Sequence, residues 1–179
     1  RTTVNASNAL SSTCGTQVNN IAYWTPYTAD PDIECYETIY SLQVYAAGTM
    51  PAMCEANTQK LSRSSRTVAN TPSRQTILDC VFGADAGGDT GFNYRFGCIS
   101  SAGALTWQAG TNCGTAKLRL IKIGIVIQSS TRRDIPSPET ITLFEDLDSL
   151  LRVTLNLTPE QRNYKWRKVE QTIVLKNLE

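Results

Sequence analysis

The chain has 179 residues with a formal net charge of +1, and charged residues make up 18% of it. This length favours one globular domain with a sizeable core, and so small a net charge does not favour nucleic acid or a membrane surface as a partner. Histidine is absent, which removes the commonest general base and the commonest metal ligand of proteins.

Sequence motifs of catalysis are absent as well. The chain contains no G-x-S-x-G, P-loop, G-x-G-x-x-G or H-E-x-x-H motif. Without histidine, a Ser-His-Asp or Cys-His site cannot form. We therefore expect a protein that is not an enzyme, with no catalytic residue, no cofactor and no metal ion.

Six widely spaced cysteines point to an exported protein. No two of them have the C-x-x-C spacing of zinc or redox sites. An even number of cysteines without histidine favours disulfides over free thiols, and disulfides imply the periplasm or the extracellular space. Spacing alone does not choose the connectivity. Sequential pairing closes the shortest loops, so we expect Cys14–Cys35, Cys54–Cys80 and Cys98–Cys113.

The first quarter of the chain predicts one strand after a polar start. Residues 1–20 are polar and weakly patterned. Residues 23–27 (YWTPY) form an aromatic cluster before a turn at residues 30–32. Such a cluster favours a contact with the core, and the alternative is a site for a sugar or another ring. Residues 36–47 alternate and predict a strand.

Residues 48–72 are interpreted as a long loop. Within it, the basic run of residues 60–66 (KLSRSSR) offers the cations Lys60, Arg63 and Arg66. Three cations suit a polyanion site. Because serines and no aromatic residues separate them, we favour a solvated surface.

The middle of the chain predicts a strand, a turn and a hairpin. Residues 75–82 are interpreted as a strand, and residues 91–107 as a hairpin with a Ser-Ala-Gly turn. Between them, residues 85–89 (DAGGD) predict a tight turn. Calcium binding by Asp85 and Asp89 is the weaker alternative, because the other oxygen ligands of an EF-hand are missing.

Two segments near the C-terminus give the clearest strand signal. In residues 117–130 (KLRLIKIGIVIQSS), isoleucine occupies every odd position from Ile121 to Ile127, which predicts a strand with one buried face. The alternation changes phase at Leu120, so we expect a bulge or a short helical start before it. Residues 164–177 (YKWRKVEQTIVLKN) predict a second strand.

Between these strands, the prolines at positions 136 and 138 end the first one. Residues 141–143 and 153–157 each alternate, which favours a hairpin. The alternative is a helix, because Phe144, Leu147 and Leu151 are also spaced for one helical face.

The last hundred residues resemble one known family. The run LRLIKIGIVIQSS, a proline-containing interval, and the final YKWRKVEQTIVLKN with its Leu175-Lys176-Asn177 tail are similar to the C-terminal half of PilW-type minor pilins of type IV pili. The segment of residues 81–91 (VFGADAGGDTG) is similar to a strand and turn of the same family. Residues 1–75 show no such similarity.

The resemblance implies a structural role in pilus assembly. It implies a mainly β, α+β pilin-like domain with an antiparallel sheet, spanning residues 1–179. Such a protein takes part in a priming or tip complex with other minor pilins and the major pilin, and supports adhesion, twitching motility or DNA uptake indirectly. Pilins carry a long apolar N-terminal helix that anchors them in the inner membrane before they join the extracellular pilus. No such helix occurs here, so we expect a soluble domain without it.

Two other functions stay open. A minor pseudopilin of a type II secretion system has the same build, although the ending of residues 164–177 favours the pilus family. The third hypothesis is a secreted module that binds glycan or nucleic acid through residues 23–27 and scattered basic side chains.

Overall fold

The computed structural model describes residues 21–27, 34–67, 73–109, 113–131 and 135–175. These residues form ten β-strands and two short 3-10 turns, and every strand pairing among them is antiparallel. The prediction of a mainly β protein with an antiparallel sheet is therefore confirmed.

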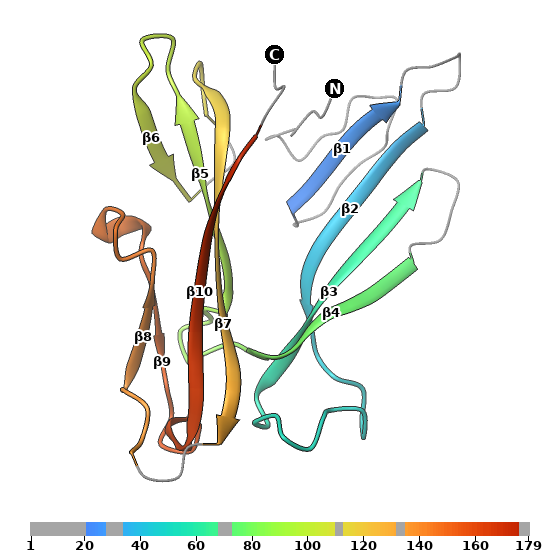
Figure 1. The fold of residues 1–179 in the computed structure, drawn as a ribbon, viewed down its shortest axis with the longest axis vertical. Helices are drawn as coiled ribbons and strands as arrows, with labels where there is room; N and C mark the ends of the chain where they lie inside the picture. The colour runs from blue at the N-terminus through green and yellow to red at the C-terminus, as the bar shows by residue number, and fades with distance from the viewer. Residues whose placement is uncertain (1–20, 28–33, 68–72, 110–112, 132–134, 176–179) are drawn as a thin grey trace.

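The first four strands form a meander. They are β1 (Ile21–Tyr27), β2 (Glu34–Gln43), β3 (Thr58–Thr67) and β4 (Ser73–Phe82), and each pairs with the next in sequence. In Figure 1 this meander occupies one side of the molecule, coloured blue to green. Strand β1 lies at the edge of the sheet. Proline lacks a backbone N–H, and Pro26 is tolerated in β1 because an edge strand has a neighbour on one side only.

The other half of the sheet is built around β7 (Lys117–Thr131). Strand β7 pairs with β5 (Phe92–Ile99) along one edge and with β10 (Tyr164–Val174) along the other. Strand β6 (Leu105–Gln108) extends the sheet beyond β5. Cys98 lies opposite Leu118 and Gly97 opposite Leu120, so Arg119 is the extra residue of a bulge. The bulge explains the change of phase in the sequence pattern.

The two halves of the sheet meet at a narrow junction. Strand β4 is paired with β7 only through Val81 and Ile127. From this junction the meander and the β5–β7–β10 half diverge, as Figure 1 shows. The divergence leaves one face of each half turned towards the other.

A hairpin covers the opposite face of the β7 half. It consists of β8 (Thr140–Leu143), the 3-10 turn η1 (Ser149–Leu151) and β9 (Val153–Asn156), and a second 3-10 turn, η2 (Gln161–Asn163), leads into β10. The hairpin prediction is confirmed against the helical alternative. The core beneath the hairpin contains the buried residues Phe82, Val126, Leu143, Phe144, Leu147, Val153, Leu155 and Leu157.

Glycine at position 124 of β7 permits the hairpin to lie close to the sheet. A Cβ atom there would come within 2.9 Å of the Phe144 ring and 3.2 Å of Leu143 Cδ1. The even positions of β7 therefore face the hairpin, and the odd isoleucines face the diverging meander.

A buried lysine forms ion pairs that connect the hairpin to the sheet. The ammonium group of Lys122 forms an ion pair with Asp146 and lies 3.5 Å from Glu170. Glu170 in turn accepts a 2.9 Å hydrogen bond from the backbone N–H of Phe144. Because Lys122 is buried, loss of either partner would leave a charge with incomplete compensation.

The interpretation of residues 48–72 as a loop was wrong for its second half. Residues 58–67 form β3, which pairs with β2 on one side and β4 on the other. The basic run lies within this strand, with Leu61, Ser62 and Ser64 buried and Arg63 exposed. Serine has little preference for strands, so the two neighbouring strands determine this conformation.

Candidate functional site

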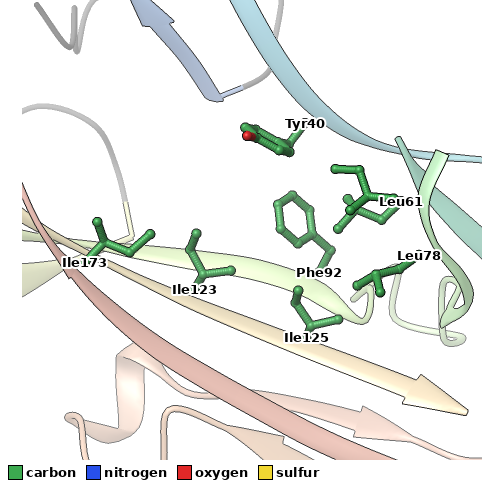
Figure 2. A pocket seen from close by; sticks show the side chains of 8 residues that line it. Tyr40, Leu61, Leu78, Phe92, Ile123, Ile125 and Ile173 are labelled. Atoms are coloured by element: carbon green, nitrogen blue, oxygen red, sulfur yellow. The ribbon is translucent and has the colours of Figure 1, made fainter. Parts of the chain in front are cut away.

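An apolar cleft lies between the two halves of the sheet. It has a volume of about 480 Å³ and is lined by Tyr40, Leu61, Ile77, Leu78, Phe92, Ile123, Ile125 and Ile173. Figure 2 shows side chains from both halves pointing into this space. The cleft is the most distinctive surface feature among the described residues.

The β5–β7–β10 wall follows from strand periodicity. Ile123 and Ile125 are consecutive odd positions of β7, and Phe92 of β5 lies directly opposite Ile125. On the other side of β7, Ile173 belongs to the face of β10 that continues this surface. The alternation seen in the sequence thus produces one continuous apolar wall.

The meander supplies the opposite wall. Tyr40 of β2 and Leu61 of β3 are on the same face, because Tyr40 is opposite Arg63, two residues from Leu61. Leu78 of β4 is opposite Leu61. Ile77 and Leu78 are adjacent yet both line the cleft, because a register irregularity in β4 lies at this point.

Several apolar side chains at the cleft stay in contact with solvent. Ile77 is 45% exposed and Ile173 is 38% exposed. Val169, on the same face of β10 as Ile173, is 53% exposed. Because exposed apolar side chains occur on both walls, we take this cleft as the candidate binding surface.

Two exposed arginines lie in strands that line the cleft. Arg63 lies opposite Tyr40 on the meander, and Arg167 lies opposite Ile127 on the other half. Both arginines are exposed.

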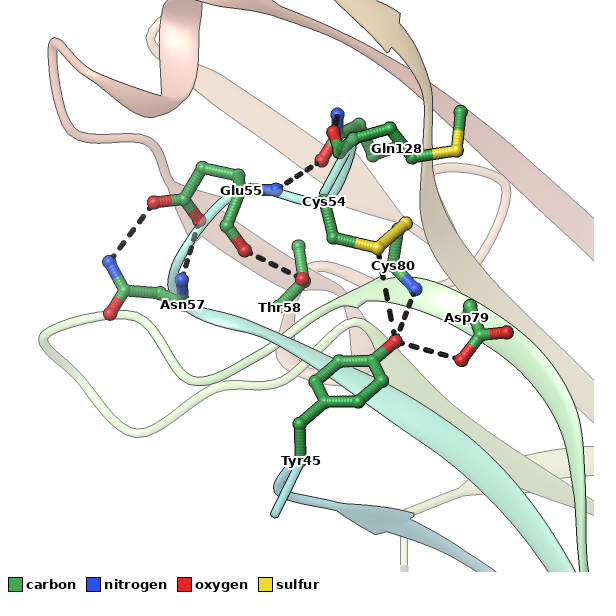
Figure 3. Close-up of a disulfide and its surroundings, with 9 residues drawn as sticks. Tyr45, Cys54, Glu55, Asn57, Thr58, Asp79, Cys80 and Gln128 are labelled. Carbon is green, nitrogen blue, oxygen red and sulfur yellow. Dashed lines mark hydrogen bonds between the residues drawn. A yellow bond between two sulfur atoms is a disulfide. The ribbon is translucent and has the colours of Figure 1, made fainter. Parts of the chain in front are cut away.

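Next to the junction of β4 and β7, a disulfide joins Cys54 and Cys80, whose Cα atoms are 5.1 Å apart (Figure 3). Next to it, the Gln128 side chain of β7 donates to the Met53 carbonyl at 2.6 Å and accepts from the Glu55 N–H at 2.7 Å. The loop before β3 is thereby bound both to β4 and to β7. These links fix the spacing of the two walls at their junction.

Tyr45 adds two hydrogen bonds beside this disulfide. Its hydroxyl oxygen accepts a hydrogen bond from the Cys80 N–H at 2.9 Å, and the hydroxyl donates to Asp79 Oδ1 at 3.0 Å. Burial raises the pKa of the Tyr45 hydroxyl, and the neighbouring Asp79 adds to the increase. The hydroxyl therefore stays protonated and keeps its role as donor at physiological pH.

Two of the three expected disulfides lie among the described residues. They are Cys54–Cys80 and Cys98–Cys113, the second and third of the sequential pairs. Cys14 lies outside the described residues, and the side chain of Cys35 in β2 is not described, so the first pair stays a prediction. Two disulfides indicate an oxidising, periplasmic or extracellular location.

The other candidate sites from the sequence, the aromatic segment and the three cations, do not come together at the cleft. The aromatic segment of residues 23–27 forms β1, and its side chains lie outside what is described. Of the three cations, Arg63 borders the cleft, while the side chain of Arg66 is not described. Among the described residues there is no helix of the length and apolarity that a membrane span requires.

Asp85 holds a turn, and its two carboxylate oxygens already have partners. Oδ1 accepts hydrogen bonds from the N–H groups of Gly87 and Asp89, and Oδ2 accepts from the backbone and side-chain amides of Asn156, all within 3.1 Å. The turn prediction is confirmed. In the described part of the chain, no group of three or more acidic or cysteine side chains is placed to hold a metal ion.

This turn gives the protein an acid-sensitive contact. Burial raises the pKa of Asp85, but the hydrogen bonds from Asn156, Asp89 and Gly87 outweigh it, so the pKa is lowered overall. The hydrogen bond from Lys122 likewise lowers the pKa of Asp146. Because both carboxyls bind protons more readily in the unfolded chain, their stabilisation is present above about pH 4 and is lost as the pH falls through the folded-state values.

We therefore expect Asp85→Asn to lower the free energy of unfolding at pH 7 by roughly 1–2 kcal/mol and to reduce the loss of stability below about pH 4. Urea unfolding of the two proteins between pH 7 and pH 3 measures both effects. Equal stability of the two proteins at pH 7 would contradict the role of the charged acceptor.

The sequence predicted the strands that carry Tyr40, Ile77 and Leu78 of the meander wall, but it did not predict β3, which carries Leu61, or that these side chains form one wall. The alternation in β7 and β10 predicted their apolar face, but Leu61 lies in a serine-rich run and Ile77 at an irregular point of β4. The adjacent pair Ile77-Leu78 was the available signal, since two consecutive apolar residues in a strand indicate a bulge or two buried faces.

Comparison with known protein-family models, with curated proteins and with solved structures finds no match to this chain.

Proposed function

We propose that this chain is the globular domain of a PilW-type minor pilin, a structural subunit that takes part in type IV pilus assembly. The observation that carries the proposal is the open apolar cleft with walls on both halves of the sheet. The similarity of the C-terminal segments to this family adds a second, independent argument.

The cleft suits an apolar helix. All the side chains that line the two walls of the cleft are aliphatic or aromatic. An α-helix with its side chains is about 10 Å across. Apolar surface that a helix and the cleft bury against each other would stabilise the contact by about 25 cal/mol per Å². Pilin subunits carry a long apolar helix, and the exposed Ile77 and Ile173 would be covered when it docks.

A helix placed there would complete an α+β arrangement. The described residues supply the β-sheet, the covering hairpin and two disulfides. The helix would supply the α layer on the face that the hairpin leaves open. This combination is the pilin-like fold that the resemblance implies.

The partners in this proposal are other minor pilins and the major pilin. The full-length protein is anchored in the inner membrane, faces the periplasm before assembly, and enters the extracellular pilus in a priming or tip complex. Its contribution is interface formation without catalysis. Effects on adhesion, twitching or DNA uptake follow from the number of pili.

Deletion of the gene tests the proposal. We expect fewer surface pili in the deletion strain, and recovery when the full-length, membrane-anchored protein is restored. Electron microscopy and sheared-pilus preparations give the count. Normal piliation in the deletion strain, together with tight binding of a glycan by the pure domain, would contradict the proposal and favour the secreted binding module.

A further inference from the structure

Strand β10 has one paired edge and one open edge. It pairs with β7 along its whole length, in register from Trp166 to Val174. The N–H of Leu175 donates to the Arg119 carbonyl at 2.8 Å, so the odd residues of β10 direct their backbone groups towards β7. Because backbone direction alternates along a strand, the even residues from Lys168 to Val174 direct theirs outwards.

The outward groups have little protection at the C-terminal end of β10. Among the described residues no backbone partner occupies them; the Thr172 carbonyl accepts from the Gln171 side chain at 3.1 Å. Natural proteins protect edges with charges or covering elements. Near the start of β10, Lys168 contacts the hairpin through Thr142 and Glu145. Residues 171–174 (QTIV) are uncharged and exposed.

We infer that this edge pairs with β10 of a second copy of the chain, antiparallel, about a two-fold axis at Gln171. This register places Glu170 opposite Thr172, whose outward backbone groups exchange hydrogen bonds. It also places Val169 opposite Ile173 on the cleft face, which covers two exposed apolar side chains in each copy. The inference depends on the geometry of β10 and does not depend on the pilin assignment.

The charges along β10 are compatible with this register. Lys168 faces Val174, so no like charges are opposed near the axis. The Glu170 carboxylate is already bound to the Phe144 N–H and close to Lys122 within its own chain. Each hairpin contacts β10 at Lys168 and at Glu170. Along the paired strands, at about 3.4 Å per residue, the Lys168 contacts of the two copies are about 20 Å apart and the Glu170 contacts about 7 Å apart.

A single substitution separates the open edge from the paired one. Thr172→Pro removes an N–H that points outwards and leaves the ladder with β7 intact, and proline is tolerated at strand edges whose N–H faces solvent. Thr172→Val keeps the N–H and serves as the matched control. Sedimentation velocity over a range of protein concentrations gives the mass of each protein.

We expect the mass of the wild-type protein and of Thr172→Val to rise from one chain towards two with concentration, while Thr172→Pro stays at one chain. A wild-type protein that remains at one chain throughout, or a Thr172→Pro protein that associates equally, would overturn the inference. Amide exchange of the wild-type protein provides a second measurement that needs no variant. Protection of the Glu170 and Thr172 amides should increase with concentration, and concentration-dependent protection confined to other residues would place the contact elsewhere.

Discussion

Replacing Phe144 with alanine is expected to lower the free energy of unfolding by about 3–5 kcal/mol. Phe144 is completely buried beneath the hairpin and lies over Gly124 of β7. The guanidinium of Arg95 lies 5.0 Å from its ring centroid. Alanine would remove the ring from the centre of the core and would leave this buried cation without its aromatic neighbour.

The backbone at this position is strained in the wild type and would stay strained in the variant. Phe144 has a φ angle of 62°, a left-handed conformation that non-glycine residues adopt with strain. Alanine would keep this strain while losing the packing that compensates for it. Denaturant unfolding measures the change, with Leu150→Ala as control, because Leu150 is 90% exposed. A loss below about 1 kcal/mol at Phe144 would contradict its central role in the core.

Removal of the Cys54–Cys80 disulfide is expected to lower the free energy of unfolding by about 2–5 kcal/mol. The bridge closes a loop with a sequence separation of 26, so its loss increases the conformational freedom of the unfolded chain. The double substitution of both cysteines by serine, compared with the wild type in denaturant unfolding, gives the value.

The same variant should also loosen the loop before β3, next to the junction of β4 and β7. Without the bridge, the loop before β3 keeps the hydrogen bond that Gln128 donates to the Met53 carbonyl and the one that Gln128 accepts from the Glu55 N–H, but it loses its covalent link to β4. We expect faster amide exchange at residues 53–58 in the double-serine protein. Unchanged stability and unchanged exchange there would contradict the structural role of this bridge.

Local sequence pattern predicted the elements whose partners are nearby or whose periodicity is strong. Strands β7 and β10, the β5–β6 hairpin, the β8–β9 hairpin and the turn at Asp85 all follow from alternation and turn residues. Strand β3 does not, because its serines and basic residues give no strand signal. Its conformation depends on pairing with β2 and β4, which a local pattern does not contain.

The cleft was predictable only in part. Isoleucines at odd positions predicted one apolar wall, but the divergence of the sheet depends on the single pairing of Val81 with Ile127. No local pattern indicates that β4 meets β7 at one point only. The ion pairs of Lys122 with Asp146 and Glu170 were equally hidden, because they join residues that the fold brings together from distant positions.

Ile77→Asp tests whether the cleft between the two halves of the sheet is an assembly surface, as we propose. Ile77 lines the cleft and is partly exposed, so aspartate there should leave the domain folded while placing a charge in the apolar contact. Leu150→Asp is the matched control on the hairpin, which covers the other face. In the deletion strain, we expect full-length Leu150→Asp to restore surface pili and full-length Ile77→Asp, at equal protein level, to fail. Equal restoration by both variants would contradict the claim.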